Sequence, residues 1–196
     1  MTQIKGQLTT ADYLHIDDYN RLVSGLHSDE LYVWELFCRL AFCAGLRASD
    51  VLSLKWKHVL NVDFIGKLEQ KTQKGRQIKL NASVRNKLSE LYQLLGSPCK
   101  ELPVVCNPKT KQPYSLEYIN RKLKDFCVRY RLPVKAFSTH TFRKTFGRYV
   151  YENSGRNAES LILLNTIFRH SSVEITKRYI GIRQDEINRV FDSIQF

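Results

Sequence analysis

The sequence has no C-x-x-C pair, and its cysteines form an odd set without regular spacing. They are Cys38, Cys43, Cys99, Cys106 and Cys127. A disulfide framework needs an even set, and a zinc cluster needs closely spaced ligands, so the pattern argues against both. Three of them stand among apolar neighbours, which is typical of core cysteines rather than reactive ones: Cys38, Cys43 and Cys127.

Long apolar runs are also lacking. The longest stretch, LYVWELFCRLAFCAG, contains Glu35 and Arg39 and is too short to cross a bilayer. The sequence does not open on a recognisable signal peptide. We therefore expect a reduced, cytoplasmic protein with no membrane partner.

Acidic residues are scarce in two segments of a chain whose formal net charge is +12. Residues 121–148 contain nine Lys or Arg against Asp125 alone, and residues 55–87 contain nine against Asp63 and Glu69. The first 35 residues lean acidic instead. This segregation predicts a basic face, and nucleic acid is the partner that such a face fits. Charge alone leaves open a protein that is basic without binding a polyanion.

Hydrophobic residues make up 43% of the 196 residues, which is enough for a sizeable core. Apolar periodicity predicts a helix capped at Thr9 or Thr10 and a short one starting near Ala48 or Ser49. Further helices are expected over residues 29–44, 82–95, 115–131, 139–153 and 158–168. An amphipathic tail helix is expected from about residue 184.

Residues 58–80 differ in character from the helical segments. They alternate between apolar and polar residues, contain β-branched side chains, and carry the turn signal QKGR. This pattern predicts a small antiparallel sheet. The expected fold class is therefore mostly α with a small antiparallel β-sheet, in one domain without repeats or linkers.

The stretch HTFRKTF places His140 and Arg143 three residues apart, which is the same face of a helix. Arg47 follows Gly45 at a break between two predicted helices, where helix N-termini favour anions. His170 stands at another break, and a tyrosine lies nine residues beyond it. Taken singly, each of these is better explained by structure than by function: Arg47 as a surface arginine, His140 and Arg143 as a structural pair, and the tyrosine as a half-buried core residue.

Together and in this order, these residues resemble the tyrosine recombinase (phage integrase) family. CAGLRASDVLSLKW resembles its first arginine box, with Arg47, and THTFRKTFG resembles its H-x-x-R box, with His140 and Arg143. FRHSSVEITKRYIGI resembles its third box, with His170 and the nucleophile Tyr179. The resemblance extends from about residue 9 to the end of the chain.

The predicted hairpin KTQKGRQIKL is similar to the lysine-bearing β-turn of the family. Counting back from the apolar end of its second strand places Lys71 at the family lysine, with Lys74 as the alternative. Two departures stand out. The family commonly has Leu-Gly before the third-box histidine, where this chain has Phe168-Arg169, and glycine takes a positive φ that arginine resists. Asp50 stands where the family more often has Glu.

The resemblance implies a site-specific recombinase that cleaves and rejoins double-stranded DNA through a 3′-phosphotyrosyl intermediate. Arg47 and Arg143 can each fork onto the oxygens of one phosphate. Tyr179 would be the nucleophile, and because a free phenol has a pKa near 10, His140 is the neighbour that would take its proton.

The remaining roles also come from the resemblance. Lys71 would protonate the leaving 5′ oxygen, and His170 would donate a further hydrogen bond to the phosphate. No cofactor or metal is expected, because no carboxylate cluster in the sequence has metal-ligand spacing. The alternatives are a type IB topoisomerase-like nicking and closing enzyme, or a DNA-binding module that has lost catalysis. The last predicts damage to a catalytic position, and the sequence shows none.

We expect residues 1–196 to form a single catalytic domain, without the N-terminal DNA-clamping domain that family integrases usually carry. A homotetramer on DNA, associated with the nucleoid, is the expected assembly, and a monomer is the alternative for the free protein. The tail carries an apolar stripe that would either pack on its own domain or exchange with a neighbouring protomer: Ile187, Val190, Phe191 and Ile194.

Overall fold

The computed structural model describes residues 12–68, 75–182 and 191–194. Within these ranges it is mostly helical, with α1 (Ile16–Ser28), α2 (Tyr32–Cys43), α3 (Ala48–Leu52), the short 3₁₀ helix η1 (Trp56–His58), α4 (Ala82–Leu94), α5 (Leu116–Arg129), α6 (Thr139–Asn153), α7 (Ala158–Phe168) and α8 (Val173–Tyr179). Strands β1 (Phe64–Leu68) and β2 (Gly75–Lys79) pair antiparallel in a two-stranded sheet, with Ile65 opposite Ile78. The expected fold class, mostly α with a small antiparallel sheet, is confirmed.

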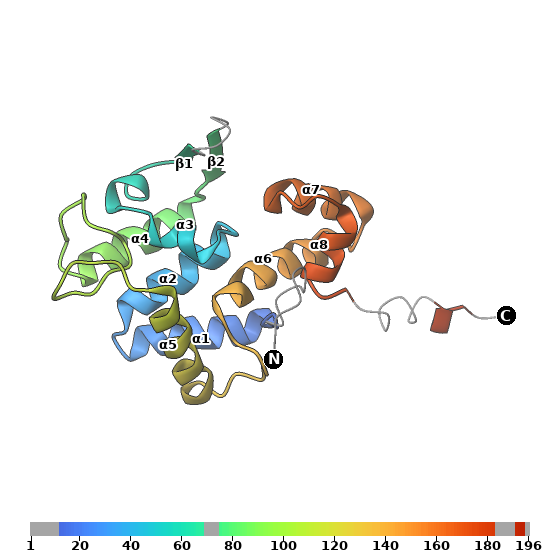
Figure 1. The fold of residues 1–196 in the computed structure, drawn as a ribbon, viewed down its shortest axis with the longest axis horizontal. Coiled ribbons are helices and arrows are strands. Elements are labelled where there is room, and N and C mark those ends of the chain that lie inside the picture. The colour runs from blue at the N-terminus through green and yellow to red at the C-terminus, as the bar shows by residue number, and fades with distance from the viewer. Residues whose placement is uncertain (1–11, 69–74, 183–190, 195–196) are drawn as a thin grey trace.

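Two hydrophobic clusters meet along α6. The larger one contains buried side chains of α1, α2, α4, α5 and the start of α6, including Phe37 and Phe142. The smaller one joins α7 and α8 through Leu164, Phe168 and Tyr179, and the later turns of α6 pack on it. Figure 1 shows α7 and α8 beyond one end of α6, with α1 to α5 toward the other end. Helix α6 is therefore the element that positions the third box relative to the rest of the domain.

Side-chain caps explain why several helix boundaries could be predicted. The Ser138 hydroxyl accepts the backbone N–H of His140, and the Ser138 N–H donates to the hydroxyl of Thr141, which fixes the start of α6. Ser115 caps α5 by accepting the N–H of Tyr118, as expected. The predicted bounds 139–153 and 158–168 are confirmed for α6 and α7.

The first helix begins later than expected. Thr9 and Thr10, its predicted caps, lie outside the described residues, and α1 starts at Ile16 after His15. The preceding residues make long-range hydrogen bonds instead: the Asp12 carboxylate accepts the backbone N–H of Lys135, and the Leu14 N–H donates to the Thr145 hydroxyl at 2.9 Å. These tertiary contacts hold residues 12–15 out of the helix.

The second helix is also shorter at its start. It begins at Tyr32 rather than at Asp29. Asp29 closes α1 and accepts a hydrogen bond from the Tyr130 hydroxyl at 2.6 Å, while Glu30 has a φ of 57° in the turn between the helices. At the other end, Gly45 terminates α2 as predicted, with a φ of 53°.

No helix in the described ranges is long and apolar enough to cross a membrane. The expected tail helix from about residue 184 falls largely on residues outside those ranges. Phe191 and Ile194 are described, and both are exposed.

Candidate active site

Five of the six predicted catalytic residues belong to the described part of the chain, and they come from three separate segments. Arg47 is the N-cap of α3, directly after the turn that ends α2. His140 and Arg143 occupy the first turns of α6. His170 lies in the turn between α7 and α8, and Tyr179 is the last residue of α8. Lys71 and its alternative Lys74 lie outside the described residues.

Arg143 is the residue that joins these segments. Its side chain is 3% exposed and donates hydrogen bonds to the carbonyls of Gly45 and Phe168, the latter at 2.9 Å. Its guanidinium also stacks on the Phe168 ring, 4.3 Å from the centroid, and forms a hydrogen bond with the Tyr179 hydroxyl. One buried cation therefore contacts the loop before Arg47, the turn before His170, and Tyr179 itself.

Tyr179 is buried, with 7% of its surface exposed. Its ring packs edge-on against His170 at 5.0 Å between centroids and against Phe168 at 5.4 Å, and the Lys144 ammonium lies 5.4 Å from its ring centroid. Burial raises the pKa of the Tyr179 hydroxyl above its ordinary value, while the charges of Arg143 and Arg47 and the hydrogen bond from Arg143 act in the opposite direction. The unliganded site therefore holds a neutral phenol among cations.

The positive charges of Arg47 and Arg143 act on both histidines. Partial burial, followed by the charges of Lys144, Arg143 and Arg47, lowers the pKa of His140. Burial, then Arg143 and Arg47, lowers the pKa of His170. Both imidazoles are thus neutral at pH 7, and each has one nitrogen able to accept a proton.

Residue 169 adopts the left-handed conformation that the family glycine suggests. Arg169 ends α7 with a φ of 53°, where an L side chain is strained by about 1–2 kcal/mol. The arginine therefore adopts the left-handed turn that precedes His170 despite its side chain.

Residues that the sequence did not single out complete the site. Thr176 is fully buried, and its hydroxyl oxygen lies 3.0 Å from His170 Nδ1. Asn165 of α7 lies next to that hydroxyl and to the carbonyls of the turn between α7 and α8. Thr176 stands three residues before Tyr179, one turn back on the same helix, which is the spacing that could have found it. Lys144, the residue after Arg143, packs over the ring of Tyr179.

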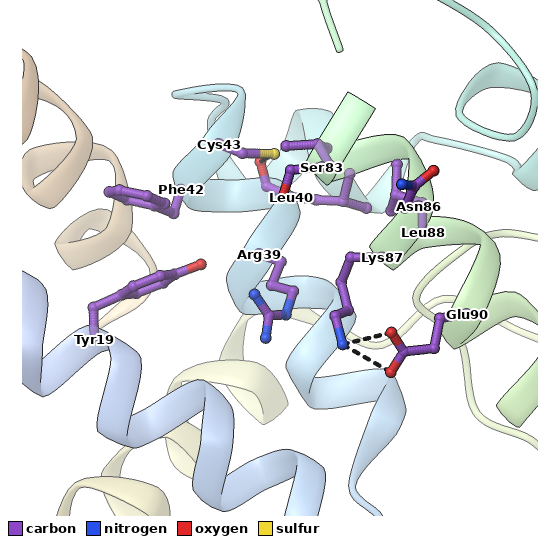
Figure 2. A pocket seen from close by; sticks show the side chains of 11 residues that line it. Tyr19, Arg39, Leu40, Phe42, Cys43, Ser83, Asn86, Lys87, Leu88 and Glu90 are labelled. Carbon is purple, nitrogen blue, oxygen red and sulfur yellow. Dashed lines mark hydrogen bonds and ion pairs between the residues drawn. The ribbon is translucent and has the colours of Figure 1, made fainter. Parts of the chain in front are cut away.

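A separate cavity of about 600 Å³ opens between α1, α2 and α4, and none of the five described candidate catalytic residues lines it. Figure 2 shows its charged side chains, of which Lys87 pairs with Glu90 at 2.7 Å. Arg39 pairs with the buried Glu35 at 2.7 Å, and burial raises the pKa of Cys43 to about 12, so its thiol stays protonated. The described lining of the cavity offers no activated group, so the cluster around Arg143 remains the candidate site.

Residues 12–186 match the Phage integrase family. The probable integrase/recombinase YoeC of Bacillus subtilis (strain 168) is 34% identical over 142 residues, which cover 72% of this chain and 74% of that protein. The tyrosine recombinase XerC of Rickettsia bellii (strain OSU 85-389) is 29% identical over 71% of this chain, which corresponds to only 44% of XerC.

Solved structures share the fold. The XerA recombinase superposes with a TM-score of 0.71 at 19% identity, covering 98% of this chain and 68% of XerA. A lambda integrase tetramer bound to a Holliday junction superposes with a TM-score of 0.63 at 15% identity, covering 90% of this chain and 50% of that one. With the family match and the similarity to YoeC, these likenesses lead to one conclusion: the chain belongs to the phage integrase family and carries the catalytic domain of a site-specific tyrosine recombinase.

Proposed function

We propose that this domain cleaves and rejoins double-stranded DNA through a covalent 3′-phosphotyrosyl intermediate on Tyr179. The observation that carries the proposal is the position of Arg143, a buried cation in contact with the segments that hold Arg47, His170 and Tyr179. A phosphate placed against Arg143 would meet all three at once. Fixed cations of this kind stabilise charge that develops in a transition state.

The first half-reaction would begin at the Tyr179 hydroxyl. Its oxygen attacks the phosphorus, and the bond between phosphorus and the 5′ oxygen breaks as the new phosphodiester forms. Since burial keeps the phenol protonated, a base must take its proton, and His140 is the neutral imidazole on α6 suited to that role. Arg47 and Arg143 bind the non-bridging oxygens.

The leaving 5′ oxygen needs a proton, which we assign to Lys71, with Lys74 as the alternative on the same predicted turn. His170 donates a hydrogen bond to the phosphate. A second 5′ hydroxyl then attacks the phosphotyrosine and releases Tyr179, so the energy of the broken bond is kept in the covalent intermediate. Each bond that breaks is matched by a bond that forms, so these steps need no cofactor.

We further propose that the active assembly is a homotetramer on DNA. The lambda integrase of the same fold was crystallised as a tetramer bound to a Holliday junction, and the net charge of +12 favours binding to phosphates. The apolar positions of the tail, Ile187, Val190, Phe191 and Ile194, would mediate the exchange between protomers. DNA flanking the gene is the first substrate to test.

Replacing Tyr179 with phenylalanine is expected to abolish covalent attachment to DNA while DNA binding persists, because only the nucleophilic oxygen is removed. The measurement is a protease-sensitive protein–DNA adduct, formed without added metal and resolved on a denaturing gel. Tyr149→Phe is the matched control, since Tyr149 is exposed on α6 and should leave the adduct intact. An adduct formed by Tyr179→Phe would disprove the assignment of the nucleophile.

The rate of cleavage is expected to fall at acid pH with a midpoint below 6.5. The base must be neutral, and the lowered pKa of His140 means that it protonates only below the ordinary imidazole range. The measurement is the single-turnover rate of adduct formation between pH 5 and 8. His140→Gln should be slow at every pH and should lack this acid limb. A midpoint at or above 6.5 would contradict the assignment.

A further inference from the structure

A short chain of hydrogen bonds runs beneath His170, between α7 and α8. His170 Nδ1 lies 3.0 Å from the hydroxyl oxygen of Thr176, whose side chain is fully buried. On the other side of the hydroxyl lies the amide of Asn165. The direction of these hydrogen bonds decides which nitrogen of His170 carries its proton.

The surroundings of Asn165 fix the direction of the first hydrogen bond. Its amide end faces the carbonyls of Ser172 at 2.7 Å and His170 at 3.2 Å. A carbonyl only accepts, so the NH₂ group must point toward this end, and the same nitrogen lies 3.0 Å from the Thr176 hydroxyl. Its two protons serve three acceptors: one goes to the Ser172 carbonyl, the shortest contact, and the other is shared between the Thr176 hydroxyl and the more distant His170 carbonyl. The hydroxyl oxygen is therefore placed to accept from Asn165.

The hydroxyl has one proton to donate and two acceptors in reach. His170 Nδ1 lies at 3.0 Å, whereas the Ser172 carbonyl lies at 3.5 Å and already accepts from Asn165. The shorter contact to an otherwise unused lone pair is favoured. With Nδ1 accepting, the proton of a neutral imidazole must be on Nε2, and burial beside Arg143 and Arg47 lowers the pKa of His170 so that the neutral form dominates at pH 7.

We propose that Thr176 and Asn165 are positioning residues that hold His170 as the Nε2–H tautomer, so that it donates a hydrogen bond to the scissile phosphate. The opposite tautomer would turn a lone pair toward a negatively charged oxygen and repel it. This inference rests on the proposed function, because it assigns His170 a phosphate as its acceptor. The network serves a chemical purpose similar to that of groups that fix the tautomer of a metal-binding histidine.

The tautomer can be measured without any reaction. In the full chain labelled with ¹⁵N-histidine, two-bond ¹⁵N–¹H correlations distinguish Nε2–H from Nδ1–H, and His170→Gln identifies the signals. We expect Nε2–H in the wild type and in Thr176→Ser, which keeps the hydroxyl. In Asn165→Asp the carboxylate should take the hydroxyl proton, so that Nδ1 must donate and the tautomer should change. If His170 of the wild type proved to be the Nδ1–H tautomer, the proposal would be wrong, whatever the variants showed.

Cleavage supplies the second readout. Thr176→Val keeps the shape of the side chain but removes the hydroxyl, and should slow adduct formation by about 10–100-fold, the usual effect of removing a group that orients a functional histidine. Thr176→Ser should restore the rate to within a few-fold of wild type. A wild-type rate in a folded Thr176→Val would refute the positioning role. Failure of the wild type to cleave would count against the proposed function instead, while the tautomer measurement would still decide the network.

Discussion

Replacing Arg143 with alanine is expected to abolish DNA cleavage and to destabilise the fold in the same protein. The side chain is 3% exposed and donates to the carbonyls of Gly45 and Phe168. Its removal takes the donor away from these two carbonyls. Each carbonyl that stays unsatisfied lowers the free energy of unfolding by about 1–3 kcal/mol. It also removes a fixed cation from the phosphate site, which lowers the rate by about 10²–10³-fold or more.

Arg47 provides the matched comparison, because it should serve the phosphate without supporting the fold. Its side chain is exposed, and it makes no side-chain cap to α3. Arg47→Ala should therefore lose cleavage to a similar degree while its free energy of unfolding stays within about 0.5 kcal/mol of wild type. Urea denaturation and single-turnover cleavage, measured on both variants, test the distinction.

Arg143→Lys sharpens the same test. Lysine keeps the positive charge, but its ammonium cannot span two carbonyls and a phenol as a planar guanidinium does. We expect it to remain far below wild type in cleavage and to recover little stability. If Arg143→Ala unfolded at the same urea concentration as wild type, the linking role of Arg143 would be wrong, whatever its effect on cleavage.

Helix boundaries were predictable where a local side chain sets them. Ser138, Ser115 and Gly45 each act within a turn of their own position in the sequence, so pattern and structure agree at those ends. The start of α1 was not predictable, because Asp12 is held by backbone groups of residues 135 and 136, more than a hundred residues away. Such a contact outweighs local helix propensity and leaves no trace in the nearby sequence.

The order of the boxes predicted which segments would lie together around Arg143, whereas it did not predict the contacts within the cluster. The spacing of His140 and Arg143 suggested two side chains aimed at one point. In the structure both residues lie in the first turns of α6, and the charge of Arg143 acts on His140. What the spacing did not predict is that Arg143 is buried and donates to carbonyls of two other segments, while His140 is exposed. The network of Thr176 and Asn165 depends on how α7 meets α8, which no single-helix pattern contains.

The positions of the positive charges were also only partly predictable from the sequence. Residues 121–148 were expected to contribute to a basic face. Three of their nine cations are instead buried on α6, namely Arg143, Lys144 and Arg148. Lys144 lies over the Tyr179 ring, and Arg148 pairs with Glu152 at 2.7 Å. A count of charges cannot separate cations that bind DNA from cations that build the site beneath it.

Gly147→Ala is expected to slow cleavage by about 100-fold while leaving a folded protein. Gly147 lies on α6 where the smaller cluster packs against it, and an added Cβ would stand 2.6 Å from Ile180 and 2.8 Å from Phe168. Ordinary contact begins near 3.4 Å, so these neighbours must move. Both are adjacent to candidate catalytic residues: Ile180 follows Tyr179, and the carbonyl of Phe168 accepts a hydrogen bond from Arg143. A displacement of about 1 Å at a reacting group lowers rates by about 10²-fold.

The stability of this variant should change less than its activity. Overpacking costs about 1–3 kcal/mol, but alanine in place of glycine within a helix returns about 1 kcal/mol. Gly66→Ala is the control for folding, because an added Cβ there meets nothing within 4 Å. Urea denaturation should therefore show a free energy of unfolding for Gly147→Ala no more than about 2 kcal/mol below that of wild type. This loss is smaller, in free energy, than the expected loss in its single-turnover rate. A wild-type rate in Gly147→Ala would mean that α6 does not set the position of Tyr179, since the cluster would then absorb the methyl group without moving the nucleophile.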